Sequence, residues 1–205
     1  KFKLFLEFVQ DGGYENSIYW EAAINDNPKF MENEIKKFVG KFGKPGPSNW
    51  SYGMHPDGQE NFPVTGISWF EAMAYAKYKK LSLPNVYQWA TAATLSSSSS
   101  FMYNSNFSQN QLINVGSQDN SNFNGLYDIA GNVREWIVNS LSDDSSIKGI
   151  LGGSFNDEPY YFNDYFGQNS MDRSLGNGLR LVKNSQSEFK TDITAKDQYY
   201  VKVRE

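Results

Sequence analysis

The stretch that most constrains the fold of this chain runs from Asn124 to Val138 and reads NGLYDIAGNVREWIV. Gly131 can adopt a positive φ without a steric penalty, so the chain can reverse direction there. We expect Asn132 to cap a helix, with the carboxylate of Glu135 completing a capping box. Three apolar residues would share one face of that helix: Val133, Trp136 and Ile137.

The same atoms support a second interpretation. An Asn amide oxygen, a Glu carboxylate and the carbonyls of a glycine turn are hard oxygen ligands of the kind that Ca²⁺ prefers. Capping and metal binding both need Asn132 and Glu135 at this spacing. The residues alone therefore leave both roles open.

Aromatic side chains supply most of the area that this chain can bury. Of its 205 residues only 39% are hydrophobic, yet 16% are aromatic, and aromatic rings bury the largest areas. Seventeen Gly and seven Pro without a repeat favour many turns over long regular elements. We expect one loop-rich α+β domain over residues 1–183, truncated at its N-terminal edge, and a polar tail or linker over residues 184–205.

Capping and periodicity locate the regular elements of this domain. Ser68 with Glu71, and Asn85 with Gln88, have the spacing of capping boxes and predict two successive helices. Helical spacing of apolar residues and short apolar runs predict the remaining elements. We expect further helices over residues 2–9 and 28–42, and short strands over residues 63–67, 150–155 and 178–182.

Charge and composition exclude several classes of function. A net charge of −4 argues against binding the phosphate backbone of a nucleic acid. No apolar run approaches the roughly 18 residues that span a bilayer, so we expect no membrane partner. The chain has no Cys and a single His, His55, which leaves no thiolate chemistry and no separate base for a Ser-His-Asp triad. We interpret His55 as a solvated loop residue.

Arg180 is an unusual member of the predicted final strand, which reads GLRLV. An Arg between two Leu residues normally bridges core carbonyls or a carboxylate. We therefore expect a structural role for Arg180.

Five motifs in order resemble the sulfatase-modifying factor family, also called the formylglycine-generating enzyme domain: PVTGISWFEAMAYAKY, LPNVYQWATAA, NGLYDIAGNVREW, LGGSF and GLRLV. The resemblance runs from about Phe5 to Lys183 and implies a C-type-lectin-like fold with little regular structure. Three further motifs, GGYENSIYW, KPGPSNW and LGGSFNDEPYYFND, resemble the variant fused to bacterial serine/threonine kinases. This variant implies a kinase domain in the same chain and a bacterial cytoplasmic or periplasmic location.

The resemblance does not extend to the chemistry of the family. Its enzymes carry two Cys after the GGS motif, which bind copper and oxidise a substrate Cys to formylglycine. The corresponding positions here are Asp157 and Phe162, and neither supplies the soft sulfur that copper(I) requires. Related families hold non-haem iron with several His, of which this chain has one. We therefore expect no copper or iron, although a metal-dependent oxidoreductase with ligands from elsewhere in a longer protein is the alternative.

The resemblance does imply calcium. The family binds this ion at a GN-x-x-E turn, which here would use the side chains of Asn132 and Glu135. A second calcium site of the family would lie near Asn106 and Phe107, with Asp119 as a candidate partner. Backbone carbonyls complete the first site, whose residues are Gly131, Asn132, Val133 and Glu135.

The leading hypothesis is a non-catalytic module that reuses the former active-site groove to bind a peptide, a protein or a small polar ligand. Two carboxylates, an Arg and a Trp would suit a polar or cationic partner. The alternative is that Asp157 and Glu158 only form a solvated turn before Pro159. The candidate groove residues are Trp136, Ser154, Asp157, Glu158 and Arg173.

Overall fold

The computed structural model describes residues 1–95, 99–141 and 144–183. The predicted tail over residues 184–205 lies outside the described residues. No helix in the three described ranges combines the length and the apolar character needed to cross a membrane.

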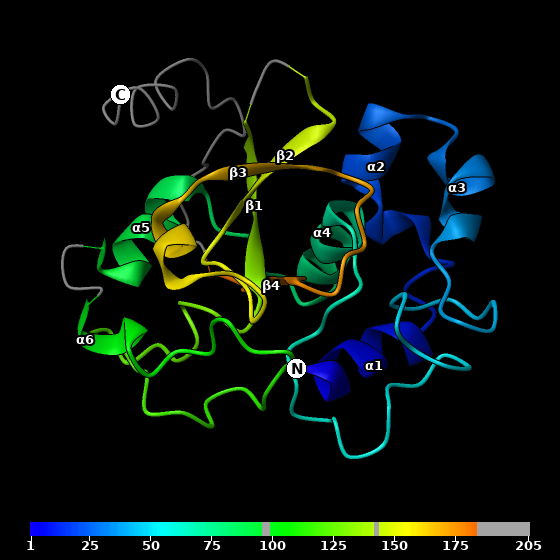
Figure 1. The fold of residues 1–205 in the computed structure, drawn as a ribbon. Coiled ribbons are helices and arrows are strands. Elements are labelled where there is room, and N and C mark those ends of the chain that lie inside the picture. The colour runs from blue at the N-terminus through cyan, green and yellow to red at the C-terminus, as the bar shows by residue number, and fades with distance from the viewer. Residues whose placement is uncertain (96–98, 142–143, 184–205) are drawn as a thin grey trace.

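A small four-stranded sheet forms the centre of the fold (Figure 1). The strand order is β3-β2-β1-β4, in which β1 is antiparallel to β2 and parallel to β4, and β2 is antiparallel to β3. The register places Trp136 of β1 opposite Ile150 of β2 and Leu179 of β4. The strands are β1 (Arg134–Ser140), β2 (Ile147–Leu151), β3 (Phe166–Asn169) and β4 (Asn177–Leu179).

The helices are short and lie on both sides of this sheet. In Figure 1, α4 lies on one side and α5 with α6 on the other, while α1, α2 and α3 extend the α4 side. The 3₁₀ turns whose bounds lie in the described ranges are η1 (Ser17–Tyr19), η2 (Ile35–Lys37) and η4 (Pro159–Asn163). The helices are α1 (Phe2–Gln10), α2 (Glu21–Asp26), α3 (Phe30–Asn33), α4 (Trp69–Tyr78), α5 (Val86–Ala93) and α6 (Ser99–Met102).

The sheet separates two hydrophobic cores. Side chains alternate across a strand, so Trp136 faces one core and its neighbour Ile137 faces the other. The first core is aromatic and includes Phe2, Phe5, Phe8, Trp20, Trp50 and Phe70. The second, smaller core includes Trp89, Phe101, Leu151 and Phe162.

Helix positions were predicted correctly where the sequence has a capping box or clear helical periodicity. The helix expected over residues 2–9 is confirmed, and so are both capping boxes, in which Ser68 and Asn85 each accept a hydrogen bond from the backbone of the residue three positions on. The helix expected over residues 28–42 is wrong, because the chain forms only α3 and η2 there. The strand expected over residues 63–67 is absent, and those expected over 150–155 and 178–182 are displaced to β2 and β4.

The helix expected after Asn132 is also wrong, since residues 134–140 form strand β1. Asn132 has a φ of 62°, which is left-handed, whereas a helix cap adopts an extended conformation. Burial of Trp136 and Ile137 in different cores shows the two-residue period of a strand. The spacing of apolar residues in this stretch fits either period, and tertiary packing selects the strand.

Candidate functional site

The turn at Gly131 lies tightly between two other segments. Gly131 has a φ of 72°, and a Cβ atom at this position would lie 2.6 Å from the carbonyl oxygen of Asn106. Its amide donates to the carbonyl of Gly152 at 2.9 Å, and the amide of Asn132 donates to that of Asn106 at 2.9 Å. Only glycine satisfies both the positive φ and the close approach.

The side chain of Asn132 is almost fully buried, with 1% exposed. Its Oδ1 accepts hydrogen bonds from Asn106 Nδ2 and from the amide of Ile113, both at 3.2 Å. Its Nδ2 donates to the carbonyl of Ile113 at 3.2 Å. The amide thus fixes the loop before β1 to the turn.

Glu135 holds three parts of the chain together. It is 3% exposed, and its carboxylate accepts from Trp89 Nε1 of α5 at 2.8 Å and from Arg180 Nε at 3.0 Å. Arg180 Nη2 lies 2.8 Å from Glu135 Oε1 and completes the ion pair. Arg180 also donates to the carbonyls of Tyr127 at 3.0 Å and Asp128 at 3.3 Å. Burial lowers the pKa of Arg180, but the Glu135 carboxylate outweighs this effect and leaves that pKa above its ordinary value. The structural role expected for Arg180 is confirmed.

These contacts bear on the predicted calcium site at Gly131, Asn132, Val133 and Glu135. A cation at this turn would have to displace Arg180 or Trp89 from Glu135, because both carboxylate oxygens already accept hydrogen bonds. Within the described ranges, no three His, Cys, Asp or Glu side chains are grouped so that they could hold a metal ion. Calcium binding at this turn stays a prediction.

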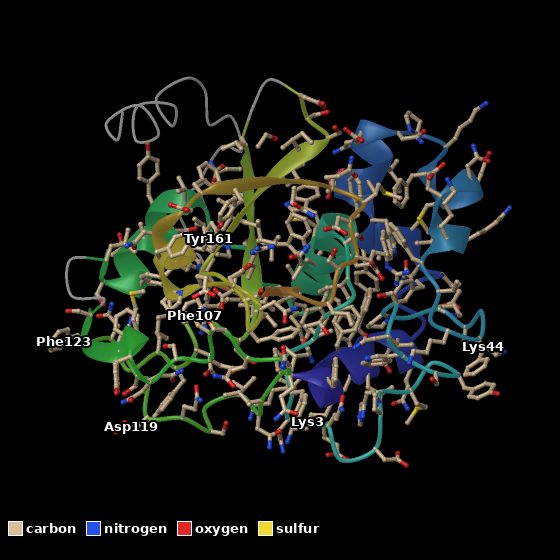
Figure 2. All side chains as sticks on the ribbon, in the orientation of Figure 1. Lys3, Lys44, Phe107, Asp119, Phe123 and Tyr161 are labelled. Carbon is tan, nitrogen blue, oxygen red and sulfur yellow. The ribbon has the colours of Figure 1, made fainter. Side chains whose placement is uncertain are left out.

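The residues of the second predicted calcium site do not share one environment. Asn106 is buried and donates to Asn132 Oδ1 and to the carbonyl of Gln111. The ring of Phe107 packs under Gly153 in the second core. Asp119 is exposed, and its backbone carbonyl accepts from Asn104; Figure 2 labels it at the outer edge of the molecule.

Asp157 and Phe162, the positions that correspond to the family's Cys pair, lie in different environments. Asp157 Oδ2 accepts from the amide of Ser154 at 2.6 Å and from its hydroxyl at 2.9 Å, while Oδ1 accepts from Arg134. Phe162 is fully buried in the second core against Trp89. One position is thus a partly exposed ion pair and the other is core.

Two of the predicted groove residues are engaged by contacts within the chain. Trp136 is 0% exposed, and its Nε1 donates to the carbonyl of Ile67. The guanidinium of Arg173 binds both carboxylate oxygens of Glu71 at 2.9 Å and the carbonyls of Gly46 and Val39. Trp136 is thus part of the first core, and Arg173 neutralises the buried Glu71.

The other three predicted groove residues do come together. Ser154 holds Asp157, and the next residue, Glu158, is exposed and accepts from the hydroxyl of Ser108 at 3.0 Å. Arg134, which was not predicted from the sequence, completes this group. A strand period would have placed Arg134 on the same face as Trp136 and opposite Asn177, but the stretch was assigned to a helix.

An aromatic strip extends from Arg134 along the surface. Its guanidinium lies 5.4 Å from the ring of Phe166, whose centroid is 5.6 Å from that of Tyr161. The ring of Tyr160 lies 4.2 Å further on and is 65% exposed. A hydrogen bond with Tyr161 raises the pKa of Tyr160, and nearby Glu158 and Asp164 add to this rise. We call the set Arg134, Asp157, Glu158, Tyr160, Tyr161 and Phe166 the Arg134 surface; Figure 2 labels Tyr161 within it.

His55 differs from its interpretation as a solvated residue. It lies in a loop, but its ring stacks on that of Phe2 at 5.9 Å and meets Trp50 edge-on at 5.7 Å. His55 thus covers the end of the first core.

Comparison with known proteins agrees with this geometry. The profile of the sulfatase-modifying factor enzyme 1-like domain matches residues 3–185. The crystal structure of CarF is similar with a TM-score of 0.53 at 19% identity, over 63% of this chain and 70% of CarF. Treponema denticola variable protein 1 is similar with a TM-score of 0.52 at 17% identity, over 79% of each chain. These likenesses confirm the expected α+β, C-type-lectin-like fold.

A short stretch is also similar to a curated protein. It is 53% identical over 34 residues to the uncharacterized protein YfmG of Bacillus subtilis (strain 168). The match covers 17% of this chain and 7% of YfmG.

Substituting Gly131 tests the close packing of the turn. Gly131→Ala adds a Cβ atom 2.6 Å from a backbone oxygen, whereas Gly125, with a similar φ of 71°, has no atom within 4 Å of such a Cβ. Both variants incur the left-handed penalty of about 1–2 kcal/mol. We expect urea unfolding to show a loss for Gly131→Ala that exceeds the loss for Gly125→Ala by at least about 1 kcal/mol. Equal losses would contradict the tight contact with Asn106.

Proposed function

The chain belongs to the family of sulfatase-modifying factor enzyme 1-like domains, and we propose that it is a non-catalytic module that binds a cationic segment of a partner protein. The ion pair between Asp157 and Arg134 supports this proposal most directly. Asp157 stands at a position where the family's enzymes have a Cys thiol. A carboxylate held by Arg134 and Ser154 offers no soft ligand for copper. No other residue of the chain can supply the missing thiol, because the sequence contains no Cys.

The Arg134 surface has the charge and the exposed aromatic ring that suit such a partner. Asp157 is neutralised by Arg134, so the exposed carboxylate of Glu158 and the nearby Asp164 leave this surface negative. Tyr160 presents a largely exposed ring beside them, and an aromatic face next to a carboxylate favours Lys or Arg side chains through cation–π attraction. Arg134 already makes that contact with Phe166.

Arg134 itself offers a donor that the described residues leave unused. Its Nε atom is buried and has no hydrogen-bond partner in the described part of the chain. Buried donors are normally satisfied, so a small movement on binding would let a carbonyl of the partner accept from it. This supports a backbone-containing partner, a peptide or protein, over a simple ion.

Short labelled peptides test the proposal. Fluorescence anisotropy should detect binding of a peptide with alternating Lys and Gly, and its Glu counterpart should not compete with it for the Arg134 surface. Glu158→Gln and Tyr160→Ala should each weaken binding at least about threefold, because each removes one attraction for the cation. Tyr103→Ala is the matched control, since Tyr103 is 95% exposed and lies outside the Arg134 surface. Unchanged affinity in both site variants would contradict the proposal.

The alternative function is a metal-dependent oxidoreductase that draws ligands from a longer protein. Elemental analysis of the purified chain separates the two. Stoichiometric copper or iron, or conversion of a sulfatase Cys peptide to formylglycine in air, would favour the oxidoreductase. We expect neither, because Asp157 and Phe162 supply no sulfur ligand.

We also propose that the module belongs to a longer bacterial protein with a serine/threonine kinase domain. The motifs GGYENSIYW and LGGSFNDEPYYFND, which resemble the kinase-fused variant, support this assignment. The coding sequence that flanks this segment in its genome decides the matter. A reading frame without kinase motifs would remove the proposal.

Calcium is the cofactor that we propose for the turn at Gly131. A bound ion should raise the melting temperature with calcium concentration by mass action. Glu135→Gln should abolish that rise if Glu135 exchanges Arg180 for the ion. Equal melting temperatures in calcium and in EDTA would assign the turn to protein contacts alone.

A further inference from the structure

Two exposed aromatic rings stack on each other in the loop between η2 and α4. The ring centroids of Phe42 and Tyr52 are 4.4 Å apart and their planes differ by 9°. Phe42 is 58% exposed, Tyr52 69% and the adjacent Met54 46%. Most single exposed apolar residues need no explanation, but a contiguous exposed group marks an interaction site.

The backbone holds these rings in place before any partner arrives. The amide of Lys41 donates to the carbonyl of Trp50 at 2.8 Å, which sets the two turns side by side, and Trp50 is fully buried beneath them. Ser51 and Met54 exchange two backbone hydrogen bonds of 3.0 Å across Tyr52 and Gly53. A rigid site loses little conformational entropy on binding.

Tyr52 has a left-handed backbone conformation that does not contribute to the stability of the fold. Tyr52 and Gly53 have φ angles of 55° and 76°, the left-handed pair of a two-residue turn for which Asn-Gly is the preferred sequence. A Tyr at the first position is strained, and its ring is mostly outside the core. Strain of this kind collects at functional positions.

Two exposed lysines, Lys41 and Lys44, lie within two residues of Phe42. No Asp or Glu occurs between Glu34 and Asp57, although the whole chain has a net charge of −4, and Lys37 in this segment is paired with Glu34. Lys41 and Lys44 are exposed, and neither forms an ion pair with another described side chain. The Cβ atom of Lys44 lies 3.8 Å from the Cβ position of Gly53, next to the turn. Figure 2 labels Lys44 at the outer edge of the molecule.

We propose that Phe42, Tyr52 and Met54, with Lys41 and Lys44 at the rim, bind an acidic segment of a partner protein that carries an apolar side chain between its carboxylates. We call these five residues the Phe42–Tyr52 patch. Aromatic residues and Met are enriched in the centres of protein interfaces, and charged residues lie at their rims. Because the chain is acidic overall, an acidic partner is repelled elsewhere and attracted here. The patch is separate from the Arg134 surface and has the opposite charge.

Fluorescence anisotropy with the labelled peptide EDEFLDEE, and its charge-reversed counterpart KRKFLRKK, tests this site. The acidic peptide should bind, and raising the salt concentration should weaken it because rim charges are screened. Tyr52→Asn removes the ring but keeps a residue that favours the turn, so it should weaken binding at least about fivefold without lowering the melting temperature. The double variant K41E/K44E should lose the acidic peptide and bind the basic one more tightly than the unaltered chain does, because the Arg134 surface already offers a site for cationic segments.

Two control variants show whether binding depends on the Phe42–Tyr52 patch. Tyr103→Asn and Phe123→Asn, which change two other exposed rings, should leave binding of the acidic peptide unchanged. No binding of EDEFLDEE by the unaltered chain, or equal binding by Tyr52→Asn, would overturn the proposal. Binding to vesicles of phosphatidylglycerol and phosphatidylcholine instead of the peptide would also overturn it, in favour of a membrane surface.

Discussion

The fold depends on the buried contact of Glu135 with Arg180 and Trp89. This one carboxylate joins strand β1, the chain beyond β4 and helix α5, while Arg180 also holds the carbonyls before the Gly131 turn. Removing one member of a buried ion pair leaves an uncompensated charge and costs about 3–5 kcal/mol. The short strands have few backbone hydrogen bonds of their own, so a contact of this size decides their arrangement.

A similar contact lies on the other side of the sheet. Glu71 is 0% exposed and binds Arg173, the hydroxyl of Tyr14 at 2.6 Å and the amide of its own cap, Ser68. Burial raises the pKa of Tyr14 well above its ordinary value, and the charge of Glu71 raises it further. Each core is thus tied to its loops by one carboxylate and one arginine. Such links connect the short helices and strands that the described residues form.

What could be predicted from the sequence was local. The capping boxes at Ser68 and Asn85 use residues three positions apart, so they were visible without the fold. The strand at residues 134–140 was not, because its choice over a helix depends on two cores built from distant segments. For the same reason Trp136 and Arg173 were assigned to a groove, although partners far along the chain hold both inside.

The candidate site was likewise predictable only where its residues lie close together in the sequence. Asp157, Glu158 and Ser154 follow one another closely and were found together, whereas Arg134 lies 23 positions away from Asp157 and joins it only across the sheet. The resulting surface differs in charge from the Phe42–Tyr52 patch on the opposite half of the sequence. The two proposed binding surfaces thus differ in charge, and each proposal names a partner segment of the opposite sign.

The most direct test of the central claim is a double-mutant cycle on Glu135 and Arg180. Urea unfolding of Glu135→Gln, Arg180→Gln and the double variant in EDTA gives the coupling free energy of the pair. In EDTA, where no calcium can exchange with Arg180, a pair that organises the fold should show a coupling of at least about 2 kcal/mol. Additive losses in EDTA, or a coupling that arises only when calcium is added, would contradict it.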